Sequence, residues 1–207
     1  MPERSYRVLL WSLALAGLLL DQASKYGVFS WLLKVDGHAH TIFKDDQGKG
    51  FHIVAQYQRD RDGELVKVNG RAVPLVNHGA LFGFLRDHTT AANTGFAVIS
   101  LLAAAAIVFW STQKATARDR WLCAALGLIL AGTLGNFYDR VTFNGVRDFL
   151  HWNYLFDWPV FNVADCCLVV GACLLLLQAF VASPKSAGEQ PAPVAGQQAA
   201  LAGSPKG

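Results

Sequence analysis

Residues Trp121–Phe137 have the sequence WLCAALGLILAGTLGNF, in which no side chain carries a charge. A helix needs about 17–25 predominantly apolar residues to cross a bilayer, and this stretch reaches that length. Three further stretches are nearly free of charge and approach or reach it: Val8–Leu20, Gly95–Trp110 and Val163–Val181. A soluble helical core could bury one such segment, but four in one chain are difficult to bury in water. The sequence therefore predicts four transmembrane helices.

The composition of the whole chain agrees with this prediction. Hydrophobic residues make up 53% of the 207 residues and charged residues only 16%, against about a quarter in a soluble domain. We expect an all-α integral membrane protein with a small extracytoplasmic antiparallel β-subdomain, its membrane domain covering residues 1–182. Residues 183–207 are mostly Ala, Pro, Gly and Gln, a composition that predicts a disordered tail.

Basic residues cluster beside those helix ends that would share one side of the membrane. They precede the first helix, separate the second from the third and follow the fourth: Arg4, Arg7, Lys114, Arg118, Arg120 and Lys185. Short flanks rich in Lys and Arg remain in the cytoplasm. Both termini are therefore predicted to be cytoplasmic, and loops 34–93 and 138–160 to lie outside. The first segment could instead be a cleaved signal peptide, which would leave three helices; we expect it to be retained as an anchor.

The long outer loop has the patterning and turn residues of β-structure. Phe51–Gln58 is a predicted strand, followed by a polar turn at Asp60–Glu64. Leu65–Val68 and Arg71–Val76 flank Asn69-Gly70, a pair that favours the positive φ angles of a tight type I′ hairpin. These signals predict a small antiparallel meander outside the membrane.

The second outer loop carries aromatic residues that alternate with more polar neighbours: Trp152, Tyr154, Phe156 and Trp158. Alternation turns one face of an extended segment towards an apolar surface. These side chains could anchor the loop at the membrane interface or form the wall of a lipid-facing pocket.

An acid and a base lie near the end of the first predicted helix. Asp21 is about 20 Å along that helix at 1.5 Å per residue, and therefore in the outer half of the bilayer. Lys25 follows at i+4 on the same helix face, in the order that favours an ion pair. Polar groups in a spanning segment are costly and indicate function. The pair could be purely structural, or Lys25 could face a substrate backbone or a lipid headgroup.

The third and fourth predicted helices bring more polar side chains to the same interface. Asn136 with Asp139, and Asn162 with Asp165, are spaced i, i+3, so each amide shares a helix face with a carboxylate. The two outer loops add further polar residues to this interface: Asp148 and the stretch Asn77–Gly83. Four separate parts of the chain thus send polar groups to one face of the membrane.

Paired carboxylates in such a place suit hydrolysis. Two acids brought close in a low-dielectric site cannot both ionise readily, so one keeps its proton near neutral pH. The charged acid can take a proton from water, while the protonated acid hydrogen-bonds the carbonyl under attack and later serves the leaving amine. Three acids could fill these roles: Asp139, Asp148 and Asp165. Each could equally be a structural acid paired with a basic neighbour, namely Arg140, Arg147 or Lys25.

Five stretches of the sequence resemble, in order, those of the bacterial lipoprotein signal peptidases, or signal peptidase II, which are membrane aspartic peptidases. They are Asp21–Lys25 (DQASK), Asn77–Gly83 (NHGALFG), Gly132–Arg140 (GTLGNFYDR), Val146–Phe149 (VRDF) and Phe161–Asp165 (FNVAD). Each stretch alone is a weak signal, but all five in order are specific. The resemblance covers about Tyr6–Val181.

The resemblance implies roles for the matched residues. The catalytic acids would be Asp148 and Asp165, and Asp139 would be structural, paired with a cation such as Arg140. The residues that orient the acids or hold the substrate would be Asp21, Lys25, Asn77, Gly79, Asn136, Arg140, Asn162 and Ala164. The chain departs from the family pattern at His78, Ala131 and Arg147, where Thr, Gly and Val are usual, and residues 44–71 are an expected insertion.

The activity implied by the resemblance is removal of the signal peptide from a prolipoprotein, by cleavage before its diacylglyceryl-modified cysteine. The site would face outwards from the bacterial inner membrane. The expected partners of a monomer are the lipid-modified precursor and membrane lipids, with no nucleic acid, metal or organic cofactor. The cysteines follow no disulfide or metal-binding pattern and are expected to be packing residues: Cys123, Cys166, Cys167 and Cys173.

Two other classes of function remain as alternatives. A small proton-coupled transporter could use Asp21, Asp139 and Asp165 as a relay, which predicts acids near the midplane and interrupted helices. A non-catalytic scaffold would hold the acids in ion pairs at helix ends, and gives Asp148 and Asp165 no reason to meet.

Overall fold

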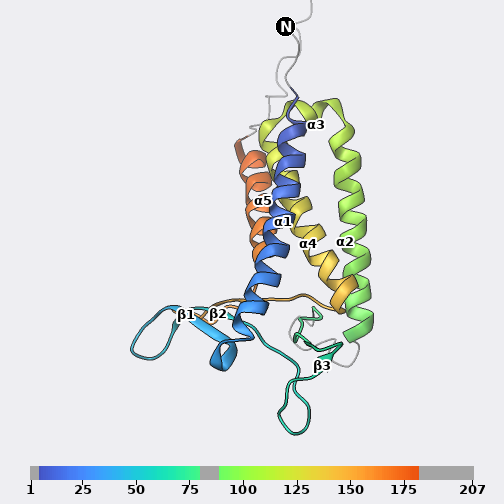
Figure 1. Cartoon of the computed structure of the whole chain (residues 1–207). Coiled ribbons are helices and arrows are strands. Elements are labelled where there is room, and N and C mark those ends of the chain that lie inside the picture. The colour runs from blue at the N-terminus through green and yellow to red at the C-terminus, as the bar shows by residue number, and fades with distance from the viewer. Residues whose placement is uncertain (1–4, 80–88, 182–207) are drawn as a thin grey trace, which may run out of the picture.

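The computed structural model describes residues 5–79 and 89–181. Its long helices are α1 (Arg7–Leu32), α2 (Thr89–Thr112), α4 (Arg120–Phe143) and α5 (Val163–Val181). All four are long and apolar enough to cross a membrane, and they run side by side in one bundle (Figure 1). The all-α membrane fold expected from the sequence is therefore confirmed.

The bounds of α5 agree with the prediction, whereas the other three spanning helices are longer than predicted. The largest difference is in α1, which continues past Leu20 to Leu32. The stretch of uncharged residues ends before Asp21. Because Asp21 and Lys25 are both fully buried in the bundle, the helix can continue past them. A short helix, α3 (Lys114–Arg118), lies between α2 and α4 and was not predicted.

Helix α4 contacts each of the other three spanning helices. Glycines allow two of these approaches to be close. A Cβ atom on Gly132 would lie 2.3 Å from the carbonyl oxygen of Ala164 in α5, and one on Gly127 would lie 2.6 Å from that of Leu10 in α1. Association of helices in lipid depends on such close packing, because lipid tails are as apolar as the side chains.

The ends of α4 are fixed by side chains suited to those positions. The Asp119 carboxylate accepts hydrogen bonds from the backbone N–H groups of Trp121 and Leu122, at 2.9 and 3.0 Å, which satisfies amides that have no partner within the helix. Asn144 ends the helix in the left-handed conformation, with φ 57°. The polar loop that carries Asp148 starts from this turn.

The β-subdomain contains two small sheets. Strands β1 (Ala39–Lys44), β2 (Gly50–Val54) and β5 (Leu150–Trp152) form an antiparallel sheet in the order β1-β2-β5. Strands β3 (Lys67–Val68) and β4 (Arg71–Ala72) form the second sheet. A 3₁₀ turn (Asp36–His38) joins α1 to β1.

The predicted β3–β4 turn is confirmed, because Asn69 and Gly70 have φ angles of 51° and 75°. The predicted strand Phe51–Gln58 is shorter than expected, since its ladder ends at Val54 and Tyr57 forms only an isolated bridge with Pro74. Strand β1 was not predicted, and the predicted alternating segment joins the sheet only up to Trp152.

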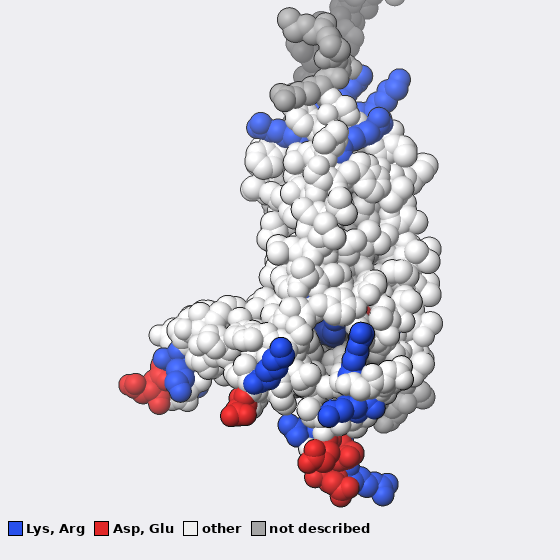
Figure 2. Space-filling view, viewed as in Figure 1, with Lys and Arg blue, Asp and Glu red and all other residues white. Residues whose placement is uncertain are grey.

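The helical bundle and the β-subdomain lie at opposite ends of an elongated molecule. The start of α1 and the end of α5 lie at the end away from the strands (Figure 1). Lys and Arg side chains gather at that end, whereas charges of both signs occur over the β-rich loops (Figure 2). The predicted tail, and residues 80–83 of the Asn77–Gly83 stretch, lie outside the described residues.

The glycine contact between α4 and α5 gives a test of the packing. Gly132→Ala should lower the free energy of unfolding in detergent by about 1–3 kcal/mol, because the new methyl group must push against a backbone oxygen. Gly95→Ala in α2 is the matched control, since a Cβ there meets nothing within 4 Å; it should leave stability unchanged or slightly higher. Equal effects of the two variants would show that α4 and α5 do not pack as described.

Candidate active site

The ion pair predicted in α1 is present. Lys25 Nζ lies 2.9 Å from Asp21 Oδ2, and both side chains are fully buried. The second carboxylate oxygen of Asp21 accepts a hydrogen bond from the backbone N–H of Ala164, at 2.9 Å. This amide belongs to the first turn of α5, where backbone N–H groups lack helical partners and favour negative charge. Asp21 therefore joins α1 to the start of α5.

Asp139 has a different cation partner from the one predicted. Arg147, not Arg140, donates to it through Nη2 at 2.8 Å and Nε at 3.2 Å, and the backbone N–H of Arg147 donates at 2.9 Å. The loop after α4 folds back and brings Arg147 beneath the last turns of the helix. Its guanidinium lies between the rings of Tyr26 and Phe143, at 4.2 and 4.1 Å.

Arg140 points elsewhere. Its guanidinium lies 5.4 Å from the ring of Phe96 in α2 and donates through Nη1 to the backbone oxygen of Asn136, at 3.3 Å. Its Nε is buried and has no hydrogen-bond partner within the described part of the chain. The family resemblance implied Arg140 as the partner of Asp139, but consecutive helical residues do not face each other.

Two acids and two bases thus form one buried cluster with no net formal charge. Lys25 lies 3.4 Å from Asp139 as well as 2.9 Å from Asp21, which links the two ion pairs. Gln22 completes the links: its amide nitrogen donates to Asp21, and its oxygen accepts from Arg147 Nη2 at 3.0 Å. Sequence reasoning missed Gln22, although its place between Asp21 and Lys25 in the first motif is a usable signal.

The predicted catalytic acids are held by asparagine amides. Asp148 accepts from Asn162 Nδ2 at 2.7 Å and from Asn77 Nδ2 at 3.0 Å. Asp165 accepts from Asn136 Nδ2 at 2.8 Å. Three asparagines from three parts of the chain therefore orient two carboxylates.

The first turn of α5 fixes Asp165 further. The Asn162 side-chain oxygen accepts from the backbone N–H of Asp165, and the Asp165 carboxylate accepts from the backbone N–H of Asn162, both at 3.1 Å. This reciprocal pair has the form of a capping box, in which a side chain three residues into the helix returns to the cap residue. The i, i+3 spacing noted in the sequence is explained by this local structure.

The two groups of acids differ in what neutralises them. Asp21 and Asp139 each contact a cation, whereas Asp148 and Asp165 have no Lys, Arg or His side chain within 4.0 Å in residues 5–79 and 89–181. Burial, together with the negative charge of Asp165, raises the pKa of Asp148 to about 6. Asp148 can therefore keep its proton closer to neutral pH than an ordinary carboxyl group.

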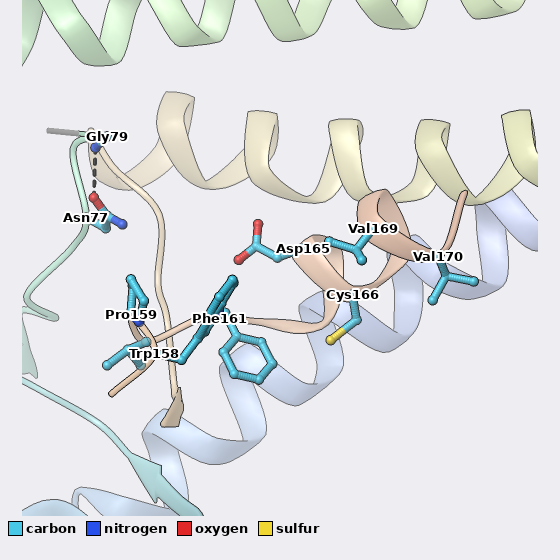
Figure 3. A pocket seen from close by; sticks show the side chains of 10 residues that line it. Asn77, Gly79, Trp158, Pro159, Phe161, Asp165, Cys166, Val169 and Val170 are labelled. Carbon is cyan, nitrogen blue, oxygen red and sulfur yellow. Dashed lines mark hydrogen bonds between the residues drawn. The ribbon is translucent and has the colours of Figure 1, made fainter. Parts of the chain in front are cut away.

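Adjoining pockets open onto these two acids. A pocket of about 730 Å³ is lined by Asp165, Phe161 and the lipid-facing residues Val169 and Val170 of α5. Figure 3 shows the Asp165 carboxylate inside this pocket, with Asn77 across from it. Asp148 lines a second pocket of about 210 Å³, and the two pockets share three lining residues: Asn77, Pro159 and Val160.

Aromatic side chains of the second outer loop extend the apolar pocket. Trp158 lines it beside Phe161, and both also line a neighbouring cavity of about 560 Å³ with Phe51, Trp152 and Phe156. Trp158 therefore forms part of a pocket wall, one of the two roles considered for this aromatic segment. Tyr154 lies outside both cavities and packs against Phe43 and Trp152.

Most of the predicted site residues meet in one network. Asn136 connects the two groups of acids, since its oxygen accepts from Lys25 Nζ at 3.2 Å while its nitrogen donates to Asp165. Gly79 donates its backbone N–H to the Asn77 side-chain oxygen at 2.8 Å and has a positive φ of 78°. Arg140 joins this network through the backbone oxygen of Asn136.

The fold and the site define a multi-pass membrane protein with paired carboxylates at one end of a helical bundle. A family model described as signal peptidase (SPase) II matches residues 13–181. A lipoprotein signal peptidase of Pseudomonas fluorescens is 39% identical over 162 residues, which are 77% of this chain and 92% of that relative. The chain therefore belongs to the signal peptidase II family.

Other relatives match over shorter stretches. The lipoprotein signal peptidases of Pseudoalteromonas translucida and Pseudomonas syringae are 41% and 42% identical, over 53% and 50% of this chain. These matches span 66% and 61% of the relatives' own lengths. Family membership and the four apolar helices indicate a multi-pass protein of the inner membrane.

Solved structures share the fold. A bacterial membrane enzyme determined by the in meso method at 2.3 Å is similar with a TM-score of 0.67 and 22% identity, covering 92% of this chain and 98% of its own. A second, at 1.9 Å, has a TM-score of 0.62 and 23% identity, covering 86% and 97%.

The cluster around Asp139 predicts strong coupling between its members. Asp139→Asn should lower the free energy of unfolding in detergent by about 3 kcal/mol, because it leaves Arg147 buried without its carboxylate. Adding Arg147→Met should cost less than the sum of the two single changes, by at least about 1 kcal/mol.

An exposed ion pair provides the control. Asp157 is 81% exposed in its pair with His151, so Asp157→Asn should change stability by no more than about 0.5 kcal/mol. Additive effects of Asp139→Asn and Arg147→Met would show that the buried pair is not formed.

Proposed function

We propose that this chain is an aspartic endopeptidase that removes the signal peptide from prolipoproteins, cutting before the diacylglyceryl-modified cysteine. Its membership of the signal peptidase II family supports the activity, and the relatives described above are lipoprotein signal peptidases. The observation that carries the mechanism is the pair Asp148 and Asp165, which accept hydrogen bonds from asparagine amides, whereas Asp21 and Asp139 form ion pairs with cations.

The proposed chemistry uses the difference between the two acids. Ionised Asp165 takes a proton from a water molecule, whose oxygen attacks the scissile carbonyl carbon. Protonated Asp148 donates a hydrogen bond to the carbonyl oxygen and gives up its proton as the tetrahedral intermediate forms. When the C–N bond breaks, the leaving nitrogen takes the proton gained by Asp165, and a hydroxyl of the intermediate returns a proton to Asp148 as the carbonyl re-forms. The raised pKa of Asp148 supports its assignment as the protonated member.

The asparagines would keep the two carboxylates in position through this cycle. Asn77 and Asn162 donate to Asp148, and Asn136 donates to Asp165. Each amide donor favours the charged form of the acid that it contacts. Asn136 also accepts from Lys25, so the buried cluster helps to fix the amide that orients Asp165.

The pockets suit a lipid-modified substrate. The large pocket beside Asp165 is open along the lipid-facing residues Val169 and Val170, where an acyl chain or a signal helix could lie. The smaller pocket beside Asp148 lies next to β2, towards the soluble side. A scissile bond held where the two pockets adjoin would contact both acids.

The proposed orientation has the β-subdomain outside the cytoplasm. Basic side chains of α3 and of the starts of α1 and α4 lie at the opposite end of the bundle (Figure 2). Short basic flanks remain in the cytoplasm. The acids then lie at the extracytoplasmic face, where a translocated precursor would present its cleavage site, and both chain termini are cytoplasmic.

The alternative functions have less support. A transporter relay predicts acids at the membrane midplane, but Asp148 lies on a loop outside the spanning helices. A scaffold would need ion pairs only, and does not account for the amide-held acids.

Cleavage of a lipidated precursor in detergent tests the proposal directly. Asp148→Asn and Asp165→Asn should each reduce kcat by at least about 1,000-fold, because each removes a proton-transfer group from the reaction. Asp62→Asn, in the exposed turn before β3, should retain wild-type activity. Folding of each variant is checked by thermal unfolding. A folded variant at either position with wild-type kcat would refute the assignment.

The pH dependence gives a second test. The value of kcat/KM should fall as the pH rises through about 6, because Asp148 then loses the proton that the reaction needs. Asn77→Ala removes a donor that stabilises ionised Asp148, so its pKa should rise and the falling limb should move to higher pH.

Asn153→Ala is the control for this experiment. Asn153 also accepts from a backbone N–H, that of Gly50, but lies in the sheet region away from both acids. In Asn153→Ala, kcat/KM should fall at the same pH as in the wild type. If kcat/KM of Asn77→Ala falls at the wild-type pH or at a lower pH, the fall does not report the titration of Asp148.

A further inference from the structure

A groove separate from the two acid pockets lies where the bundle meets the β3–β4 hairpin. It has a volume of about 1090 Å³ and is lined by the last turns of α1, the end of α4 and the hairpin. It shares no lining residue with the pockets at Asp148 and Asp165. The mechanism proposed above therefore makes no use of it.

The charged side chains that line this groove are all basic. They are Lys67 and Arg71 from the hairpin and Arg147 from the loop after α4. The charge of Arg147 is balanced by Asp139, at 2.8 Å. Lys67 and Arg71 are exposed and have no acidic side chain within 4.0 Å among residues 5–79 and 89–181. Within the described part of the chain, the groove therefore carries two positive charges that no acidic side chain contacts.

Figure 2 shows Lys and Arg side chains beside the hollow where the bundle meets the β-rich loops. The visible acidic side chains lie mainly farther out, on the tips of those loops. Basic side chains thus gather beside this hollow, at the end of the bundle next to the β-rich loops.

The wall of the groove nearest the helices is apolar and aromatic. Phe29 and Leu33 come from the end of α1, and Phe143 from the end of α4. Tyr26, which is 47% exposed, lies between them and donates or accepts a hydrogen bond with Tyr138 of α4 at 2.9 Å. An apolar wall on spanning helices, below a basic rim, matches the layout of a phospholipid, whose acyl chains lie below its phosphate.

We propose that this groove binds an anionic phospholipid of the leaflet on the β-subdomain side, with its phosphate at Lys67 and Arg71 and its acyl chains against the α1–α4 wall. Each cation near an anionic headgroup favours binding several-fold, and aromatic side chains at this level interact well with the interface. The hairpin belongs largely to residues 44–71, so the proposal also gives the expected insertion a role: it brings a lipid to the flank of the enzyme.

Native mass spectrometry of the full chain taken from nanodiscs tests this site without measuring peptidase activity. In discs of equal phosphatidylglycerol and phosphatidylcholine, the wild type should retain phosphatidylglycerol in preference by roughly tenfold. Lys67→Glu/Arg71→Glu should reduce that preference to near unity, because both phosphate partners are reversed. Lys44→Glu/Lys49→Glu is the matched control: it makes the same change of net charge on the exposed β1–β2 hairpin, and should keep the preference.

Each other outcome overturns the proposal. Equal retention of the two lipids by the wild type would show that the chain does not select an anionic lipid. Equal loss of preference in the two double variants would show that only the general surface charge attracts the lipid. Displacement of the lipid by an excess of glycerol phosphate would show that the groove recognises a soluble phosphate instead. A dimer without lipid preference would show that a second copy of the chain covers the groove.

Discussion

The structure depends on the cost of burying charge in a medium that cannot solvate it. Asp21 and Lys25 are fully buried in the second half of α1, where α4 and the loop after it bring Asp139 and Arg147 into the same cluster. The cluster therefore fixes the positions of α1 and α4 and the path of the chain towards Asp148. Asp21 also fixes the start of α5, because it accepts a hydrogen bond from the backbone N–H of Ala164.

The cost of burying charge also separates the acids by their surroundings. The cation beside an acid favours the charged form of that acid. An acid held by amides in a partly buried site has its proton affinity set by burial and by its acidic neighbour, as for Asp148. Asp139 and Asp148 lie on the same stretch of chain, but Arg147 contacts Asp139, whereas asparagine amides hold Asp148, the acid that the proposed mechanism uses.

The sequence was sufficient to predict the four helices, the Asn69-Gly70 turn and the Asp21–Lys25 pair, because each depends on local composition or spacing. It was insufficient for the partner of Asp139, since the fold of the loop after α4 decides which arginine returns to it. Strand β1 escaped prediction because its pairing with β2 is a tertiary contact. The capping box at α5 was visible as an Asn–Asp spacing, but its geometry required the structure.

In the proposed mechanism an amide-held acid, and not a cation-held one, carries the exchangeable proton. Infrared spectroscopy of the protein with isotope-labelled aspartate can follow the protonated carboxyl band from pH 5 to pH 8. The band should disappear with a midpoint near 6, be absent in Asp148→Asn and persist in folded Asp139→Asn. A band that persists in Asp148→Asn, or that is lost in folded Asp139→Asn, would contradict it.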